Sequence, residues 1–446
     1  MLTSGGVTAT VASMNTLAWW KETFAKEQER WKSVLLEAPG GEKEWSRAVR
    51  RWLGPDLLEE ELTRVVPGPL RGVPFGVKDL FDQKGGVTLA GSILLQEIGS
   101  PATHDALLVR RLRELGAIPL GRTNMNEFAY GLDGFNPHTG DCPHPRDPER
   151  IAGGSSSGSA WIVAKGILPL ALGTDTGGSV RVPAAFCGIY GFRGVPDETA
   201  REGVFPLARS FDTAGWFSST GKDMVELLEL LWKPGERGGA LRNAEGGEEQ
   251  NGLVWYAPRT VRLSEECRES YRGFLEGQPT VERSSSGAEE IARKLDAVSE
   301  DSFWAYNVIG SCEAFEVHRN WFTVYRERYN PDVWRLINRS RHWESGALDY
   351  ARRLQEEVTA LLDSVLASWD AILMPAVHTV APRKSEVDQE FRVDIIRLTS
   401  IASLAGLPVL TIPLKTASGF SCGVQVISRP ERALHVARRF LTGEAE

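Results

Sequence analysis

The sequence predicts an α/β protein in which one large, mixed and mostly parallel β-sheet is covered by helices on both faces. An apolar segment at 72–79, helical spacing at 105–115 and a second apolar segment at 117–120 indicate strand, helix and strand in turn. This alternation is typical of a βαβ unit, whose two strands are parallel. Further apolar segments of strand length return late in the chain, at 371–375, 409–413 and 423–427.

Length and composition fit such a fold. The chain has 446 residues, of which 42% are hydrophobic and 25% charged. This is the balance of an ordinary globular protein with a large core. The net charge of −8 argues against a chain-wide affinity for nucleic acid or for an anionic membrane. Since no run of about 18 apolar residues occurs, we expect no membrane span.

The N-terminal segment and the cysteines predict a cytoplasmic protein. Residues 1–14 contain neither a basic residue nor a continuous apolar segment, so no secretory signal is expected. The five cysteines are scattered and form no C-x-x-C pair, which favours free thiols in a reducing compartment. No metal-ligand spacing is present either. We therefore expect neither a metal nor a cofactor.

The pattern divides the chain into two parts. Residues 1–65 carry apolar and tryptophan residues at helical spacing, which predicts a helical segment packed on the core. Residues 66–446 would form the main α/β domain. Within it, a charged and helical stretch at about 264–366 predicts a cap-like region.

Several short motifs match the catalytic motifs of known enzyme families but lack the neighbouring strand or the companion motifs that those families have. Residues 154–158 fit G-x-S-x-G, which would make Ser156 the nucleophile of an α/β-hydrolase-type esterase. That motif should follow a buried strand, whereas 146–150 is polar. Residues 219–222 fit S-x-x-K, but no S-D-N or K-T-G motif accompanies them. No phosphate-binding loop and no H-E-x-x-H motif occurs.

A stronger constellation joins one lysine and two serines. Lys78 lies inside an apolar strand, Ser155 lies in the Gly/Ser-rich segment 153–160, and Ser179 lies in the segment 173–184. Taken singly, each has an ordinary interpretation. The lysine would form a salt bridge with a nearby aspartate such as Asp79 or Asp82, and the serines would satisfy backbone groups of their loops.

Taken together, these segments resemble the serine- and glycine-rich signature of the amidase-signature family. The resemblance includes the 24-residue step from Ser155 to Ser179 and extends from 72–74 through 404–408 to 423–425. It implies one large α/β fold and an amidohydrolase that cleaves a carbon–nitrogen amide bond. The retention of all three side chains speaks against a non-catalytic scaffold.

The resemblance also assigns roles to the three side chains. Ser179 would be the nucleophile, and its acyl-enzyme would release ammonia or an amine. Ser155, after a cis peptide bond with Gly154, would relay the proton. Lys78 would be the general base, which requires a neutral amine. Burial favours this form because desolvation lowers the pKa of a lysine.

The loop before the nucleophile would supply further groups. An oxyanion could be stabilised by the backbone N–H groups of Thr176, Gly177, Gly178 and Ser179. Asp175 and Arg181 are expected to hold the loop as an ion pair, supported by hydroxyls such as that of Ser156. Alternatively, Arg181 would bind a substrate carboxylate.

Analogy with the family also suggests a substrate pocket between two segments. The first, 125–131, supplies the candidates Met125, Phe128, Tyr130 and Gly131, and Gly153 and Gly154 are further candidates. The second is the helical region between about 304 and 343. Asn136 and His138 would offer hydrogen bonds. Aromatic residues here would equally serve to pack the sheet against its helices.

Two features bear on the more specific function. After Phe192, where relatives have Lys-Pro-Thr, this chain has Arg193 and Gly194, which puts the local turn in doubt. The segment 210–217 is similar to that of indole-3-acetamide hydrolases and related small-amide amidases, which favours a small-molecule substrate. The alternative is the glutaminase (A) subunit of a tRNA-dependent amidotransferase. By analogy with relatives, a homodimer is one option.

Overall fold

Eleven strands in the described part of the chain form one β-sheet. The computed structural model describes residues 15–37, 45–198, 201–233, 252–278, 281–282 and 285–442. In spatial order the strands are β1–β3–β2–β4–β6–β5–β10–β11–β9–β7–β8. Their bounds are β1 Val49–Trp52, β2 Pro74–Lys78, β3 Ile118–Thr123, β4 Leu170–Asp175, β5 Tyr190–Arg193, β6 Thr213–Ser218, β7 Leu253–Trp255, β8 Val281–Glu282, β9 Ala371–Pro375, β10 Val409–Lys415 and β11 Ser421–Ser428.

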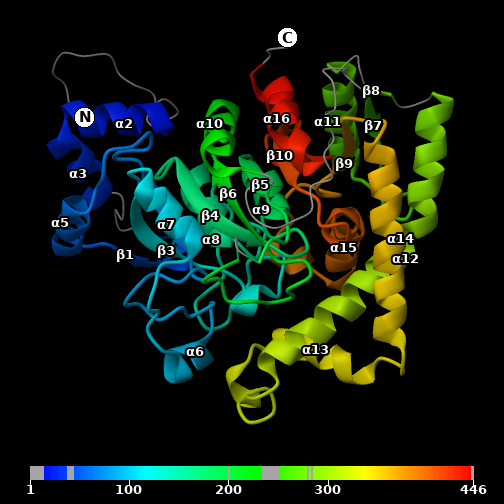
Figure 1. The fold of residues 1–446 in the computed structure, drawn as a ribbon, viewed down its shortest axis with the longest axis horizontal. Helices are drawn as coiled ribbons and strands as arrows, with labels where there is room; N and C mark the ends of the chain where they lie inside the picture. Colours follow the sequence, from blue (N-terminus) through cyan, green and yellow to red (C-terminus); the bar gives the residue numbers. More distant parts are fainter. Residues whose placement is uncertain are drawn as a thin grey trace.

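Helices surround this sheet, which confirms the predicted α/β class (Figure 1). The α-helices are α2 Leu17–Lys26, α3 Gln28–Glu37, α4 Trp45–Ala48, α5 Pro55–Thr63, α6 Ile93–Ile98, α7 Leu107–Glu114, α8 Ser157–Ala164, α9 Arg181–Cys187, α10 Gly221–Leu231, α11 Glu265–Glu276, α12 Ser286–His318, α13 Pro331–Asn338, α14 Ala347–Leu366, α15 Gln389–Leu404 and α16 Ala433–Leu441. Short 3-10 helices are η1 Glu127–Ala129, η2 Arg326–Arg328, η3 Arg339–His342, η4 Lys384–Glu386 and η5 Pro430–Arg432.

The sheet is mixed, as predicted, but parallel pairs are not in the majority. The pairs β2–β3, β2–β4, β7–β9 and β7–β8 are parallel. The continuous run β4–β6–β5–β10–β11–β9 is antiparallel throughout. One reason is the short connection between β10 and β11, because a strand pair joined by a tight turn must be antiparallel. The parallel part around β2 and β4 is buried on both faces.

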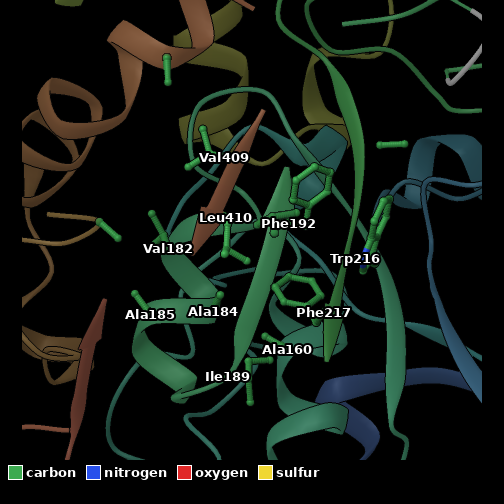
Figure 2. Packing of buried hydrophobic residues seen from close by; sticks show 14 of the residues in the cluster. Ala160, Val182, Ala184, Ala185, Ile189, Phe192, Trp216, Phe217, Val409 and Leu410 are labelled. Atoms are coloured by element: carbon green, nitrogen blue, oxygen red, sulfur yellow. The ribbon is translucent and has the colours of Figure 1, made fainter. Parts of the chain in front are cut away.

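Helix α9 is held closely against the centre of the sheet. Figure 2 shows Val182 and Ala184 of α9 beside Phe192 of β5 and Leu410 of β10. The close approach depends on Gly191 of β5, since a Cβ atom there would lie 2.7 Å from the Cβ of Ala184. The packing fixes the loop between β4 and α9, which precedes the helix.

The two ends of the molecule are built differently. Helices α2, α3 and α5 lie at one end, and α12 and α14 lie at the opposite end (Figure 1). The N-terminal part also contributes β1, which pairs with β3, so the segment predicted as helical is not entirely so. Residues 1–14, where no secretory signal is expected, lie outside the described residues. The domain boundary at 65 and the cap-like role of 264–366 stay predictions.

Within the described ranges, no helix combines the length and the apolar character that crossing a bilayer requires.

The tight contact of α9 with β5 predicts a clear difference between two glycine substitutions. Gly191→Ala should lower stability by about 1–3 kcal/mol, because the added methyl group overpacks a core contact. Gly273→Ala should raise it slightly, since that position in α11 is open and alanine favours helix. Urea unfolding of both variants measures this. Equal shifts of the two midpoints would contradict the packing described.

Candidate active site

The side chain of Lys78 is completely buried at the end of β2 and is surrounded by hydroxyl groups. Its Nζ lies 2.8 Å from Ser155 Oγ, 2.9 Å from Ser156 Oγ and 2.7 Å from Thr174 Oγ1. Because a hydroxyl can both donate and accept, these contacts suit an ammonium or a neutral amine. Thr174 was not predicted from the sequence. It comes from β4, the parallel neighbour of β2.

Burial favours the neutral form of this amine. It lowers the pKa of Lys78 to about 7, although the negative charges of Asp175 and Asp212 oppose the shift. The predicted alternative, a salt bridge with Asp79 or Asp82, is not formed, and Asp82 accepts from the Thr88 hydroxyl. Asp79 pairs instead with Arg122 at 2.7 Å. Lys78 is therefore a buried base candidate with hydroxyl partners.

Ser155 follows a cis peptide bond with Gly154, which confirms the expected geometry. The Ser155 carbonyl accepts a hydrogen bond of 3.3 Å from the N–H of Asn126. A Cβ atom on Gly154 would lie only 2.0 Å from Asn126 Oδ1, so glycine is required there. These contacts orient the Ser155 hydroxyl toward Lys78.

Ser179 is held near Ser155 through the backbone. The N–H of Ser156 donates to the carbonyl of Ser179 over 3.3 Å. The hydrogen bonds within the described ranges do not include one between the hydroxyls of Ser155 and Ser179. Ser156, the nucleophile of the esterase alternative, uses its hydroxyl on Lys78 and on the Thr174 carbonyl, and no strand precedes it directly. That alternative gains no support.

Asp175 organises the nucleophile loop through two arginines. It forms the predicted ion pair with Arg181, at 2.8 Å, and a second with Arg193, at 2.9 Å. Burial alone would raise the pKa of Asp175, but the two guanidinium groups outweigh it and hold this pKa far below its usual range. Ser156 does not join the pair, contrary to the expectation. Arg193, noted in the sequence only as a departure from relatives, is thus part of the support.

Arg181 cannot bind a substrate carboxylate, as the alternative required. It is fully buried, and besides its two bonds to Asp175 its guanidinium donates to the Thr399 carbonyl, to Gln425 Oε1 and to Ser403 Oγ, each at 2.8 Å. All its donor directions are thus used within the fold. Its role is to hold Asp175 and α9 in place.

Of the four predicted oxyanion donors, one already has an acceptor within the protein. The N–H of Gly178 donates to Asp175 Oδ1 at 2.8 Å, so it supports the loop instead. The N–H groups of Thr176, Gly177 and Ser179 have no acceptor among the described residues. Their segment is fixed on its other side by the Thr176 hydroxyl, which donates to Asp212 Oδ1 at 2.6 Å. This leaves donors that could face a developing negative charge.

A cavity of about 330 Å³ lies next to the segment of Ser155, because its lining residue Asn126 donates its N–H to the Ser155 carbonyl. Of the predicted pocket residues, Tyr130 and Gly131 line it, and Gly154 borders it because its N–H donates to the carbonyl of the lining residue Leu132 over 2.8 Å. Gly153 precedes Gly154 in the same segment. Residues of α12, α13 and α15 also line the cavity, and those of α13 fall in the helical region considered for the pocket.

The remaining pocket candidates pack the structure instead of lining this cavity. Met125 is buried, and its carbonyl accepts from Asn136 Nδ2. The Phe128 ring packs against His318 at 4.4 Å between centroids. His138 Nε2 lies 3.3 Å from the buried carboxylate of Glu127. These three side chains thus make internal contacts and do not line this cavity.

Among the residues that the structure describes, no group of three or more His, Cys, Asp or Glu side chains could hold a metal ion.

Known proteins with similar sequences and structures identify the family. The family model described as Amidase matches residues 57–250. AtzE, a 1-carboxybiuret hydrolase subunit of Pseudomonas sp. (strain ADP), is 33% identical, with 81% of each chain covered. The A component of the glutamyl-tRNA(Gln) amidotransferase of Symbiobacterium thermophilum is also 33% identical, with 81% of this chain and 80% of the relative covered.

A solved structure described as an amidase has a TM-score of 0.79 to this chain, with 31% identity, and 95% of this chain and 97% of that one are covered. Together with the buried lysine and its serine partners, these similarities show that the chain belongs to the amidase-signature family, whose members are hydrolases of amide carbon–nitrogen bonds.

Proposed function

We propose that this protein hydrolyses the amide bond of a small molecule through an acyl-enzyme on Ser179. The observation that carries the proposal is the buried amine of Lys78, which contacts the Ser155 hydroxyl at 2.8 Å and has no carboxylate partner among the described residues. A neutral amine in this position can accept a proton. The similarity to indole-3-acetamide hydrolases remains a prediction on the substrate.

The reaction would proceed in two halves. As Ser179 Oγ bonds to the amide carbon, its proton passes through the Ser155 hydroxyl to Lys78. The tetrahedral oxyanion is stabilised by N–H groups of Thr176, Gly177 and Ser179. Proton return to the nitrogen breaks the carbon–nitrogen bond and releases ammonia or an amine. A water molecule then cleaves the ester on Ser179 by the same relay.

The relay requires a contact between Ser155 and Ser179 that forms with substrate bound. Catalytic hydrogen bonds are often long in a free enzyme and tighten in the substrate complex. The backbone contact between Ser156 and the Ser179 carbonyl supports such a tightening, because it already joins the two segments.

A second candidate is the glutaminase component of a tRNA-dependent amidotransferase. It is favoured by the similarity to the A component of the Symbiobacterium thermophilum amidotransferase, which covers about four-fifths of both chains. In that case the ammonia would pass to a partner protein. Glutaminase activity together with a co-purifying partner would support this candidate over a free-standing amidase.

The cellular compartment, the absence of a cofactor and the oligomeric state belong to the same proposal. The five cysteines form no disulfide, which supports a reducing cytoplasm. The proposed chemistry uses no cofactor and no nucleic acid. A homodimer stays a prediction.

Removal of the nucleophile should abolish turnover. Ser179→Ala is expected to lower kcat by about 10³-fold or more, and Ser155→Ala and Lys78→Ala nearly as much. Ammonia release from a panel of simple amides measures this. Ser157→Ala, a change in the same signature, serves as the control and should keep its activity. Full activity of Lys78→Ala near neutral pH would refute the relay.

The pH dependence of kcat/KM should report the protonation state of the Lys78 amine. Because the base must be neutral and its pKa is lowered to about 7, kcat/KM should rise with pH and level off above about 7. Lys78→Arg should be inactive across this range, since a guanidinium keeps its proton. A rising limb that extends to about pH 10, the ordinary range of lysine, would contradict the assignment.

A further inference from the structure

The cavity adjoins the segment that contains Ser155 and is not lined by Asp175, Arg181 or Arg193. Asn126 lines it and donates its N–H to the carbonyl of Ser155. Phe303 and Asn307 of α12 also line it. On the same helix Tyr306 reaches the nucleophile loop, because a Cβ atom on Gly177 would lie 2.0 Å from its hydroxyl oxygen. The cavity therefore adjoins the Ser155 segment and the helix that contacts the loop of Ser179, although Lys78, Ser155 and Ser179 are not among its lining residues.

The carboxylates that line the cavity already have partners within the protein. Asp332 pairs with Arg335 at 3.2 Å. Asp388 caps α15 by accepting from the N–H of Phe391 at 2.8 Å. Asp133 accepts from the side-chain amide of Asn126 at 2.7 Å and from a backbone N–H at 2.9 Å. None of these carboxylates lies within ion-pair distance of the two arginines considered next.

Two arginines on the cavity wall lack such partners. The guanidinium of Arg392, on α15, lies 5.6 Å from the ring centroid of Tyr130. Arg339, at the start of η3, donates to Asn307 Oδ1 at 3.3 Å. Neither forms an ion pair with any carboxylate of the described ranges. Both line the same cavity.

The guanidinium of Arg392 is close enough to disfavour the charge of Arg339. Burial lowers the pKa of Arg339, and the positive charge of Arg392 lowers it further. An anion between them would relieve this repulsion. A guanidinium matches the two oxygens of a carboxylate with a planar fork of donors, so it is well suited to that anion.

We propose that the amide substrate carries a carboxylate, which Arg392 and Arg339 bind at the cavity wall. This inference rests on the proposed amidase function and narrows its substrate to the class of acidic amides. A cavity of about 330 Å³ lies at the small end of the range for ligand pockets, which favours a short molecule. Arg181 cannot serve this purpose, because its donors are all used within the fold.

A matched pair of amides tests whether the substrate carries a carboxylate. Succinamic acid and butyramide share a four-carbon chain that ends in the same primary amide, but only the first carries a carboxylate. The wild-type ratio of kcat/KM for the acid over the neutral amide should be about 10- to 100-fold, as expected for charged hydrogen bonds. Arg392→Gln and Arg339→Gln should each lower that ratio about tenfold, mainly through KM for the acid.

Arg335→Gln is the matched control. It removes a guanidinium from the same wall, but one that already pairs with Asp332, so the ratio should change less than about threefold. A wild-type ratio near one, or an equal fall in all three variants, would overturn the inference and leave the amidase function standing.

Protection of Ser179 by succinate against covalent labelling gives a second measurement, which requires no substrate turnover. A fluorophosphonate should label Ser179, and succinate should slow this labelling in the wild type and in Arg335→Gln but about tenfold less effectively in Arg392→Gln. Equal protection in all variants, or none in the wild type, would overturn the carboxylate site. If Ser179 were not labelled at all, the proposed function itself would fail.

Discussion

The site depends on an amine that is buried without a counter-ion in contact. Lys78 ends a strand that is covered on both faces, so its charge is disfavoured by desolvation. Three hydroxyls satisfy its hydrogen bonds and leave the proton free to move among them. A carboxylate in their place would fix the positive charge and prevent the amine from acting as a base. The choice of hydroxyl partners thus decides the chemistry.

The buried carboxylate of Asp175 lies close to Lys78 but does not hold the positive charge on the amine, because its oxygens are bound by other partners. Asp175 directly follows Thr174, whose hydroxyl contacts Lys78, yet the carboxylate of Asp175 pairs with Arg181 and Arg193 and not with the amine. The same ion pairs fix the loop in which Ser179 lies, because Asp175 also accepts from N–H groups of that loop. One carboxylate therefore shapes the nucleophile loop without contacting the base.

The sequence predicted the parts of this arrangement that are local. The apolar strands, the glycine-rich loops and the cis bond before Ser155 all follow from segments of a few residues or from a family signature. It did not predict Thr174 or Arg193 as site residues, because their roles arise from strand pairing and from contacts between distant segments. Likewise, Met125 and Phe128 are apolar in either role, so only the structure distinguishes packing from a pocket wall.

The protonation state of Lys78 is the most direct test of this account. NMR of the ε-carbons in protein labelled with ¹³C-lysine can follow it, and the Lys78 signal is assigned by its loss in Lys78→Met. The account predicts a titration midpoint at about pH 7. A lysine that stays protonated to about pH 10, as in an unperturbed side chain, would contradict it.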